Sequence, residues 1–183
     1  MEFSEFFQEV REKIFDSGVD SRLSEIAKEM ARAKADGRTV FFFGNGASAA
    51  ISSHCAIDFL KQAGIKTNTC HDVSVLTALA NDYGFDQCFA KYLALHCGPG
   101  DVVVVISVSG VSENGINVIK EAKSRGLSTI SLTGRRPDNV MHMQADIGLH
   151  VPSDAYNVVE GIHMLWITSV VDKLLGRSVY EVS

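Results

Sequence analysis

The sequence predicts an α/β fold, a doubly wound parallel sheet with helices on both faces, preceded by two N-terminal helices. Three observations predict it. Apolar, strand-like runs alternate along the chain with segments whose apolar residues recur at helical spacing. The run that starts at Val102 is apolar at successive positions, as in a parallel strand buried on both faces. Glycine and serine follow several of these runs, where a strand of such a sheet turns toward the next helix.

Each element follows from a local pattern. Apolar residues at helical spacing predict a helix over 4–17, and a second helix is expected from about Ser21 to Ala35 because Gly37 stops it. The expected strands are Thr39–Phe43, Lys66–Cys70, the run from Val102 to Ile106, Leu127–Thr133 and Ile147–Val151. The other expected helices are Ala49–Gln62, Val75–Ala80, Phe85–His96, Glu113–Arg125, Pro137–Met143 and Asn157–Leu175. We therefore expect a single domain over 1–183 with a helical extension over 1–37.

Composition excludes several functional classes. The 183 residues are 46% hydrophobic and 21% charged, which is typical of a globular protein. A net charge of −5 without a basic run argues against a nucleic-acid-binding or membrane surface, and no apolar stretch has membrane-spanning length. The first residues lack the pattern of a signal peptide. Because Cys55, Cys70, Cys88 and Cys97 lack the spacing of zinc or redox motifs, we expect reduced thiols and a cytoplasmic location.

The first candidate site follows the central strand. Ser107, Ser109 and Ser112 surround Gly110 just before a predicted helix. Hydroxyl groups, free backbone N–H groups and a helix N-terminus then converge, and this arrangement favours a phosphate without needing a lysine. The alternative is an ordinary strand-to-helix turn in which the serines only cap the helix.

Two more strand ends carry small polar residues. One is the segment Gly44–Ser48, with Asn45 and Gly46, and the other is Thr133–Gly134. Because ligands bind beyond the carboxyl ends of parallel strands, the three ends are expected to surround one ligand. The first segment superficially resembles a dinucleotide fingerprint. Its third glycine position is Ala49 and no Walker lysine follows, which disfavours nucleotide binding.

Two predicted helices carry candidate acid–base groups. His54 and Asp58 lie one turn apart on the first of them. Glu160 and His163 lie one turn apart on the last helix. His54, Asp58 and Glu160 are also candidate metal ligands, since a histidine with two carboxylates binds divalent metals. A surface ion pair is the alternative for His54 and Asp58, and Glu160 is alternatively a capping-box acid with Asn157 as N-cap. The alternative for His163 is a packed or interfacial histidine.

Several of these segments together resemble a known family. The glycine-rich segment GNGAS with its helix, ALANDYGFDQCFAKYL, ISVSGVSENG and LTG are similar to the sugar isomerase (SIS) domain, and more closely to phosphoheptose isomerases. The resemblance covers essentially the whole chain, and NDYGFD is its most specific part. It implies a SIS, flavodoxin-like fold, a phosphorylated sugar as ligand and a homotetramer.

The resemblance also implies roles for individual residues. Ser107, Ser109 and Ser112 match the serines that grip the substrate phosphate. The positions that contact the sugar are matched by Asn45, Gly46, Ser48 and Asp82. We add Thr133 as a substrate-binding candidate because it ends the neighbouring strand. The family enzyme converts sedoheptulose 7-phosphate to D-glycero-D-manno-heptose 7-phosphate, which is an aldose–ketose isomerisation.

The acid–base positions depart from the family pattern. This chain has the shorter Asp58 in place of a glutamate, and Thr168 in place of the catalytic histidine of the final helix. Threonine does not shuttle protons near neutral pH. Glu160 takes the position of a glutamine. Phosphoheptose isomerases are known as zinc-dependent, but only His54 is unchanged among the four ligand positions, so the sequence requires no cofactor and zinc stays an alternative.

The leading hypothesis is a phosphosugar aldose–ketose isomerase that works through an enediol. Asp58 would act as the base, and the second proton transfer would fall to Glu160, His54 or His163. The second hypothesis is a non-catalytic SIS protein that binds a phosphosugar or a protein partner, because the phosphate loop is intact while the acid–base pair is altered. The third is an isomerase of a different phosphosugar.

The first helix bears on assembly. Phe6, Phe7, Val10 and Ile14 form an apolar face. A sheet already covered on both sides leaves no place for that face, so we expect another subunit to bury it, with the last helix at the interfaces as well.

Overall fold

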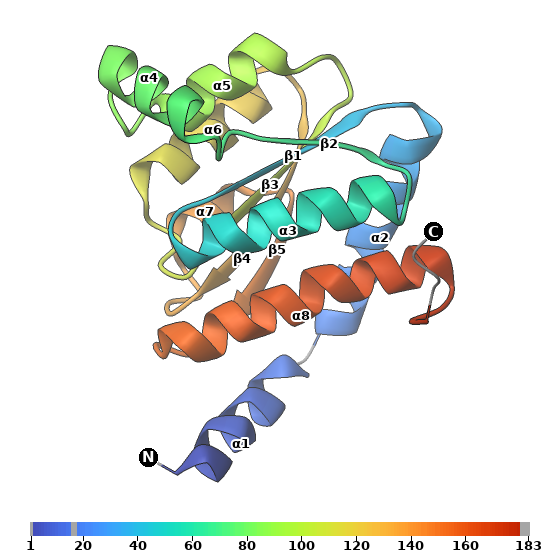
Figure 1. Cartoon of the computed structure of the whole chain (residues 1–183). Coiled ribbons are helices and arrows are strands. Elements are labelled where there is room, and N and C mark those ends of the chain that lie inside the picture. Colours follow the sequence, from blue (N-terminus) through green and yellow to red (C-terminus); the bar gives the residue numbers. More distant parts are fainter. Residues whose placement is uncertain (1, 16–17, 180–183) are drawn as a thin grey trace.

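A computed structural model describes residues 2–15 and 18–179. Its centre is a five-stranded parallel sheet in the order β2-β1-β3-β4-β5 (Figure 1). The strands are β1 (Thr39–Gly44), β2 (Lys66–Thr69), β3 (Val102–Ser107), β4 (Ser128–Gly134) and β5 (Ile147–Val151). The helices are α1 (Phe3–Ile14), α2 (Val19–Ala35), α3 (Ala47–Lys61), α4 (Val73–Tyr83), α5 (Cys88–His96), α6 (Glu113–Ser124), α7 (Val140–Gln144) and α8 (Tyr156–Leu175). The predicted α/β class is confirmed.

The central strand β3 is buried along its whole length, as its apolar run predicts. It pairs with β1 on one side and β4 on the other, with Val104 opposite Phe42 and Ile130. Because successive side chains of a strand point to opposite faces, the sheet feeds two separate cores. Phe42 and Val104 belong to one core, and Phe43 and Val105 belong to the other.

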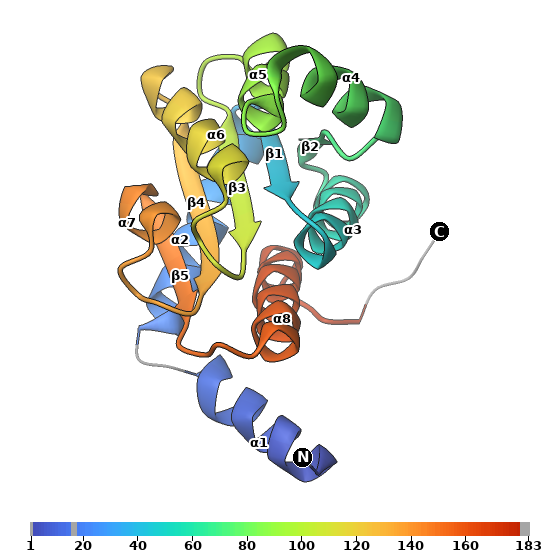
Figure 2. The ribbon, with the colours of Figure 1, turned by 90° about the vertical axis from the view of Figure 1, so that its left-hand side faces the viewer.

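Helices cover both faces of the sheet (Figures 1 and 2). Residues of α2, α3 and α8 complete the first core, and residues of α4 to α7 complete the second. Ile26 and Met30 of α2 are fully buried in the first core. The second leading helix is therefore one of the layers on the sheet and not an appendage of it. None of the described helices combines the length and the apolar character that membrane crossing requires.

The first helix finds part of its partner within its own chain. Phe6, Val10 and Ile14 are partly buried against the first core, and the Ile14 carbonyl accepts a 3.0 Å hydrogen bond from the Trp166 indole N–H of α8. Only Phe7, 66% exposed, is left facing solvent on the apolar face that we expected a second subunit to cover. The apolar surface that α1 leaves for a second subunit is therefore smaller than the sequence indicated.

Two of the helix starts that differ from expectation are set by side-chain caps. The Asp72 carboxylate accepts hydrogen bonds from the N–H groups of Ser74 and Val75, so α4 begins at Val73. The Asn139 side chain accepts a 2.9 Å bond from the His142 N–H, so α7 begins at Val140 and not at Pro137.

The last helix also begins earlier than expected. Ala155 is the N-cap of α8 and makes no side-chain cap bond, and Asn157 lies inside the helix. The capping box considered for Asn157 and Glu160 is therefore wrong. One consequence is that the Glu160 carboxylate is not tied to the backbone at the helix start.

Candidate functional site

A cavity of about 270 Å³ lies at the carboxyl edge of the sheet, between the ends of β1 and β3. Figure 2 shows both arrowheads pointing toward α8. Strand order reverses between β1 and β3, and this switch point is where open α/β sheets bind ligands. The lining residues come from three segments and are Asn45, Gly46, Ala47, Ser48, Ile106, Ser107, Val108, Ser109, Ser112, Tyr156 and Glu160.

The glycine loop, residues 44–48, brings the start of α3 close to the end of β1. A Cβ atom on Gly44 would lie 2.5 Å from the Ser48 carbonyl oxygen, so only glycine permits this approach. Gly46 has a φ of +57° and is the N-cap of α3. At the start of α3 the Ala49 and Ala50 N–H groups donate to the Gly46 carbonyl, which leaves those of Ala47 and Ser48 for a polar ligand.

The serine loop, residues 107–112, joins β3 to α6. The Ser107 hydroxyl oxygen accepts a 3.1 Å bond from the Gly110 N–H, and the Ser109 hydroxyl oxygen accepts a 3.4 Å bond from the Val111 N–H. Ser112 is the N-cap of α6, yet its side chain makes no cap bond. These hydroxyl protons are thus available to an anion, and helix capping does not account for the serines.

A pair of amides connects the two loops. The Asn45 Nδ2 group donates to the Asn114 Oδ1 atom, and the Asn114 Nδ2 group donates to the Asn45 Oδ1 atom, both at 3.0 Å. Asn114 is buried at the start of α6 and also accepts from the Gly115 N–H at 2.9 Å. The pair fixes the orientation of Asn45, a predicted sugar-binding residue, and leaves its second N–H for a ligand.

One predicted acid–base group lines the cavity. Glu160 of α8 is half-buried there, and burial raises the pKa of its carboxyl above the usual value for glutamate. Tyr156, four residues earlier, lines the same cavity and was not predicted from the sequence. Its spacing from Glu160 was the available signal, since residues four apart lie on one helix face.

The predicted acid–base pair on α3 does not line the cavity. His54 and Asp58 face each other on α3, with 3.1 Å between His54 Nε2 and Asp58 Oδ2, and the His54 side chain is 49% exposed. This is the arrangement of the alternative surface ion pair. Across residues 2–15 and 18–179, no three His, Cys, Asp or Glu side chains come together as a metal site requires. Within a single chain, His54, Asp58 and Glu160 therefore do not come together around one zinc ion.

Other predicted residues lie apart from the cavity. Thr133 is fully buried, and its hydroxyl oxygen accepts a 3.1 Å bond from the Asn139 side chain. His163 is fully buried too, and its Nε2 atom donates to the Thr133 carbonyl at 3.0 Å, since a carbonyl only accepts. Asp82 is exposed on α4, next to the Asn81 amide. The Thr168 hydroxyl donates to the Met164 carbonyl of its own helix.

Comparison with known proteins identifies the family. Residues 2–134 match the model of the SIS domain, which is more than half of the chain. The chain belongs to the SIS domain family. The "Phosphoheptose isomerase" of Nitratidesulfovibrio vulgaris is 36% identical over 163 residues, covering 85% of this chain and 76% of the relative. That of Aquifex aeolicus is 38% identical over 151 residues, covering 78% of each.

Solved structures agree with this assignment. The phosphoheptose isomerase of Neisseria gonorrhoeae has a TM-score of 0.86 and 30% sequence identity, with 95% of each chain covered. The match covers nearly the whole of both chains, so the two leading helices belong to the shared fold. The SIS domain predicted from the glycine, serine and NDYGFD segments is confirmed.

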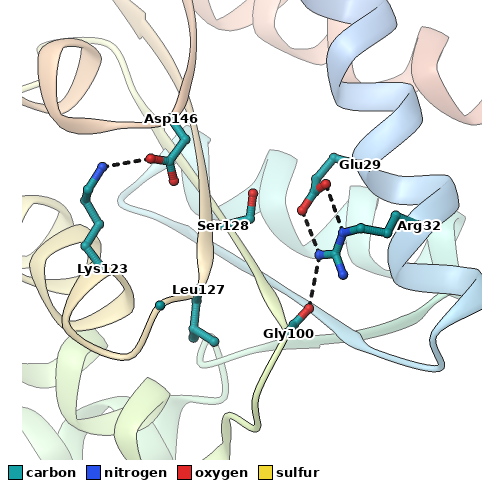
Figure 3. A pocket seen from close by; sticks show the side chains of 8 residues that line it. Glu29, Arg32, Gly100, Lys123, Leu127, Ser128 and Asp146 are labelled. Carbon is teal, nitrogen blue, oxygen red and sulfur yellow. Dashed lines mark hydrogen bonds and ion pairs between the residues drawn. The ribbon is translucent and has the colours of Figure 1, made fainter.

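A larger hollow of about 490 Å³ lies at the opposite, amino edge of the SIS sheet (Figure 3). Its charged groups already have partners: Arg32 binds Glu29 at 2.7 Å and the Gly100 carbonyl at 3.1 Å, and Lys123 binds Asp146 at 2.8 Å. Because these charges are satisfied and strand ends with ligand-binding loops lie at the other edge, we do not assign the site to this hollow.

The buried histidine of α8 gives a prediction for acid stability. Burial lowers the pKa of His163 to about 4, well below the 6.5 of an exposed histidine. Between these values the unfolded chain binds a proton that the folded chain does not, so acidification through this range lowers the free energy of unfolding, by about 3 kcal/mol for this group. Denaturant unfolding measured at pH 7 and pH 4 checks this.

The matched variant is His163→Gln, which keeps a side-chain N–H but does not titrate. Its unfolding free energy should depend less on pH than that of the wild type across this range. His96→Gln, in α5, is the control because that side chain is not fully buried. Equal pH dependence in wild type and His163→Gln would contradict the prediction.

Proposed function

We propose that the chain is a phosphosugar aldose–ketose isomerase that converts sedoheptulose 7-phosphate to D-glycero-D-manno-heptose 7-phosphate. The observation that carries the proposal is that the serine loop and Glu160 line one small cavity at the switch point of the sheet. Relatives at 36% and 38% identity, both named phosphoheptose isomerase, support the choice of substrate.

The serine loop is the proposed phosphate site. The hydroxyls of Ser107, Ser109 and Ser112 and the N–H groups at the start of α6 would donate hydrogen bonds to the phosphate oxygens. The sugar would extend toward the glycine loop, where Asn45, Gly46 and Ser48 line the same cavity. Such a division places one end of an opened sugar within reach of α8.

Glu160 is the carboxylate that this geometry favours as base. It would take a proton from C1 and deliver it to C2, the two carbons between which the carbonyl moves, through an enediol. The raised pKa of its carboxyl follows from burial and makes the protonated form a usable acid as well. Within one chain, Glu160 therefore takes the role of base that was expected of Asp58, because Asp58 is paired with His54 on α3.

His54, Asp58 and Asp82 take part only if the cavity of one copy faces α3 or α4 of another. The resemblance to phosphoheptose isomerases implies such shared sites and a homotetramer, which we propose for this chain. Exposed apolar side chains on α1, α3 and α8 support it, namely Phe3, Phe7, Ile57, Leu60 and Leu165.

Sedimentation at micromolar concentration is expected to show a tetramer. Phe7→Glu places a charge on the proposed interface and should shift the distribution toward smaller species, because a buried unpaired charge is costly. Leu95→Glu is the matched control, since Leu95 is 71% exposed on α5, which covers the other face of the sheet. A wild-type monomer would contradict the assembly.

A coupled assay with sedoheptulose 7-phosphate tests the function directly. Saturable formation of the aldose by the purified protein supports the proposal. Turnover of other phosphosugars only would instead indicate an isomerase with a different substrate. Phosphosugar binding without turnover of any substrate would indicate a regulatory SIS protein, the remaining alternative.

The proton transfers of this scheme are assigned to side chains, and the candidate zinc ligands do not come together in one chain.

A cytoplasmic location is part of the proposal. The four cysteines are free thiols, which suits a reducing compartment.

A further inference from the structure

The substrate cavity contains a second ionisable side chain besides the proposed base. Of its eleven lining residues, nine are glycine, alanine, aliphatic, serine or asparagine, and the others are Glu160 and Tyr156. Isomerisation needs one group that moves a proton at carbon and one that moves a proton at oxygen. The cavity therefore holds two groups suited to the two tasks.

Tyr156 and Glu160 lie side by side at the start of α8. They are four residues apart on one helix and line one cavity, so the phenol and the carboxyl face the same ligand space. None of the hydrogen bonds among residues 2–15 and 18–179 involves the Tyr156 hydroxyl, and the residue is 54% exposed. The hydroxyl is thus available to a substrate oxygen.

The two histidines considered for the second proton transfer do not line the cavity. His163 is buried and bonded to the Thr133 carbonyl, and His54 pairs with Asp58 on α3. Resting on the proposed function, we propose that Tyr156 is a catalytic residue whose hydroxyl exchanges a proton with the two substrate oxygens while Glu160 moves the proton between the two carbons.

The exchange balances without an oxidant or reductant. Glu160 takes a proton from C1, the electrons of that C–H bond form the C1–C2 double bond, and the carbonyl electron pair moves to the C2 oxygen, which takes the Tyr156 proton. In the second half the phenolate takes the proton of the C1 hydroxyl. The C1 carbonyl forms, and the electrons of the C1–C2 double bond take up at C2 the proton that Glu160 removed from C1.

Tyr156→Phe removes only the hydroxyl and tests the assignment. We expect kcat to fall by about 10²-fold or more while KM stays close to the wild-type value, because the ring remains to contact the sugar. Tyr92→Phe is the control. Tyr92 lies on α5, where its hydroxyl donates to Asn68 Oδ1 at 2.8 Å, and it does not line the cavity, so the kcat of this variant should be unchanged.

The outcomes separate this assignment from the proposed function. An active wild type with equal kcat in Tyr156→Phe overturns the catalytic role and leaves the isomerase proposal intact. A raised KM with unchanged kcat also overturns it, since the hydroxyl would then only bind. A wild type that turns over no phosphosugar overturns both. Thermal unfolding of both variants checks that a loss of activity does not result from misfolding.

Discussion

Glu160→Gln is expected to lower kcat by about 10²- to 10⁴-fold, the usual contribution of a general base. The amide keeps the shape of the side chain in the cavity but cannot take a proton. Phosphate binding should persist, because the serine loop is on a different segment from α8. A coupled isomerase assay and a phosphate-binding titration on the same preparation measure both effects.

The pH profile gives a second readout for this residue. Because burial raises the pKa of Glu160, its basic form is lost at a higher pH than for an exposed glutamate. The acidic limb of kcat/KM should therefore lie above the usual glutamate range. Asp58→Asn is the companion variant. If it abolishes turnover while Glu160→Gln does not, the base is Asp58 and the assignment from cavity geometry is wrong.

Gly110→Ala is expected to lower the free energy of unfolding by about 2–4 kcal/mol and to weaken phosphate binding. Gly110 has a φ of +65°, where other L-residues are strained. An added Cβ would also lie 2.0 Å from the Oδ1 atom of Asn139. Asn139 cannot move freely, because it is buried and caps α7. Denaturant unfolding measures the loss.

Gly126→Ala is the matched control for that substitution. Gly126 has nearly the same φ, +69°, but a Cβ atom added there would have no neighbouring atom within 4 Å. It should therefore cost only the backbone strain, about 1–2 kcal/mol. The difference between the two variants isolates the contact with Asn139. Equal losses would mean that the serine loop yields to the extra methyl group.

The sheet could be predicted because its signal is local. β3 is apolar at successive positions, and such a run of β-branched residues is typical of a strand covered on both faces. Helix starts were less predictable. α7 begins after Asn139 because that side chain reaches the His142 N–H, a contact that depends on the loop conformation. Asn157 had the right residue type for a cap, but the helix starts before it.

The site was predictable where backbone topology decides it. The glycine and serine loops meet because the carboxyl ends of β1 and β3 are neighbours. Which side chains of a helix reach the cavity depends on how that helix packs. α8 turns Glu160 and Tyr156 toward the cavity and buries His163 against β4, and the spacing of the residues alone does not distinguish these orientations.

The paired amides of Asn45 and Asn114 make the two ligand loops a single unit. Rotating either amide by half a turn would set N–H against N–H and oxygen against oxygen, so each residue dictates the orientation of the other. Exchanging one loop for that of another protein would break this match. Any attempt to change the substrate by loop grafting should therefore move residues 44–48 together with the start of α6.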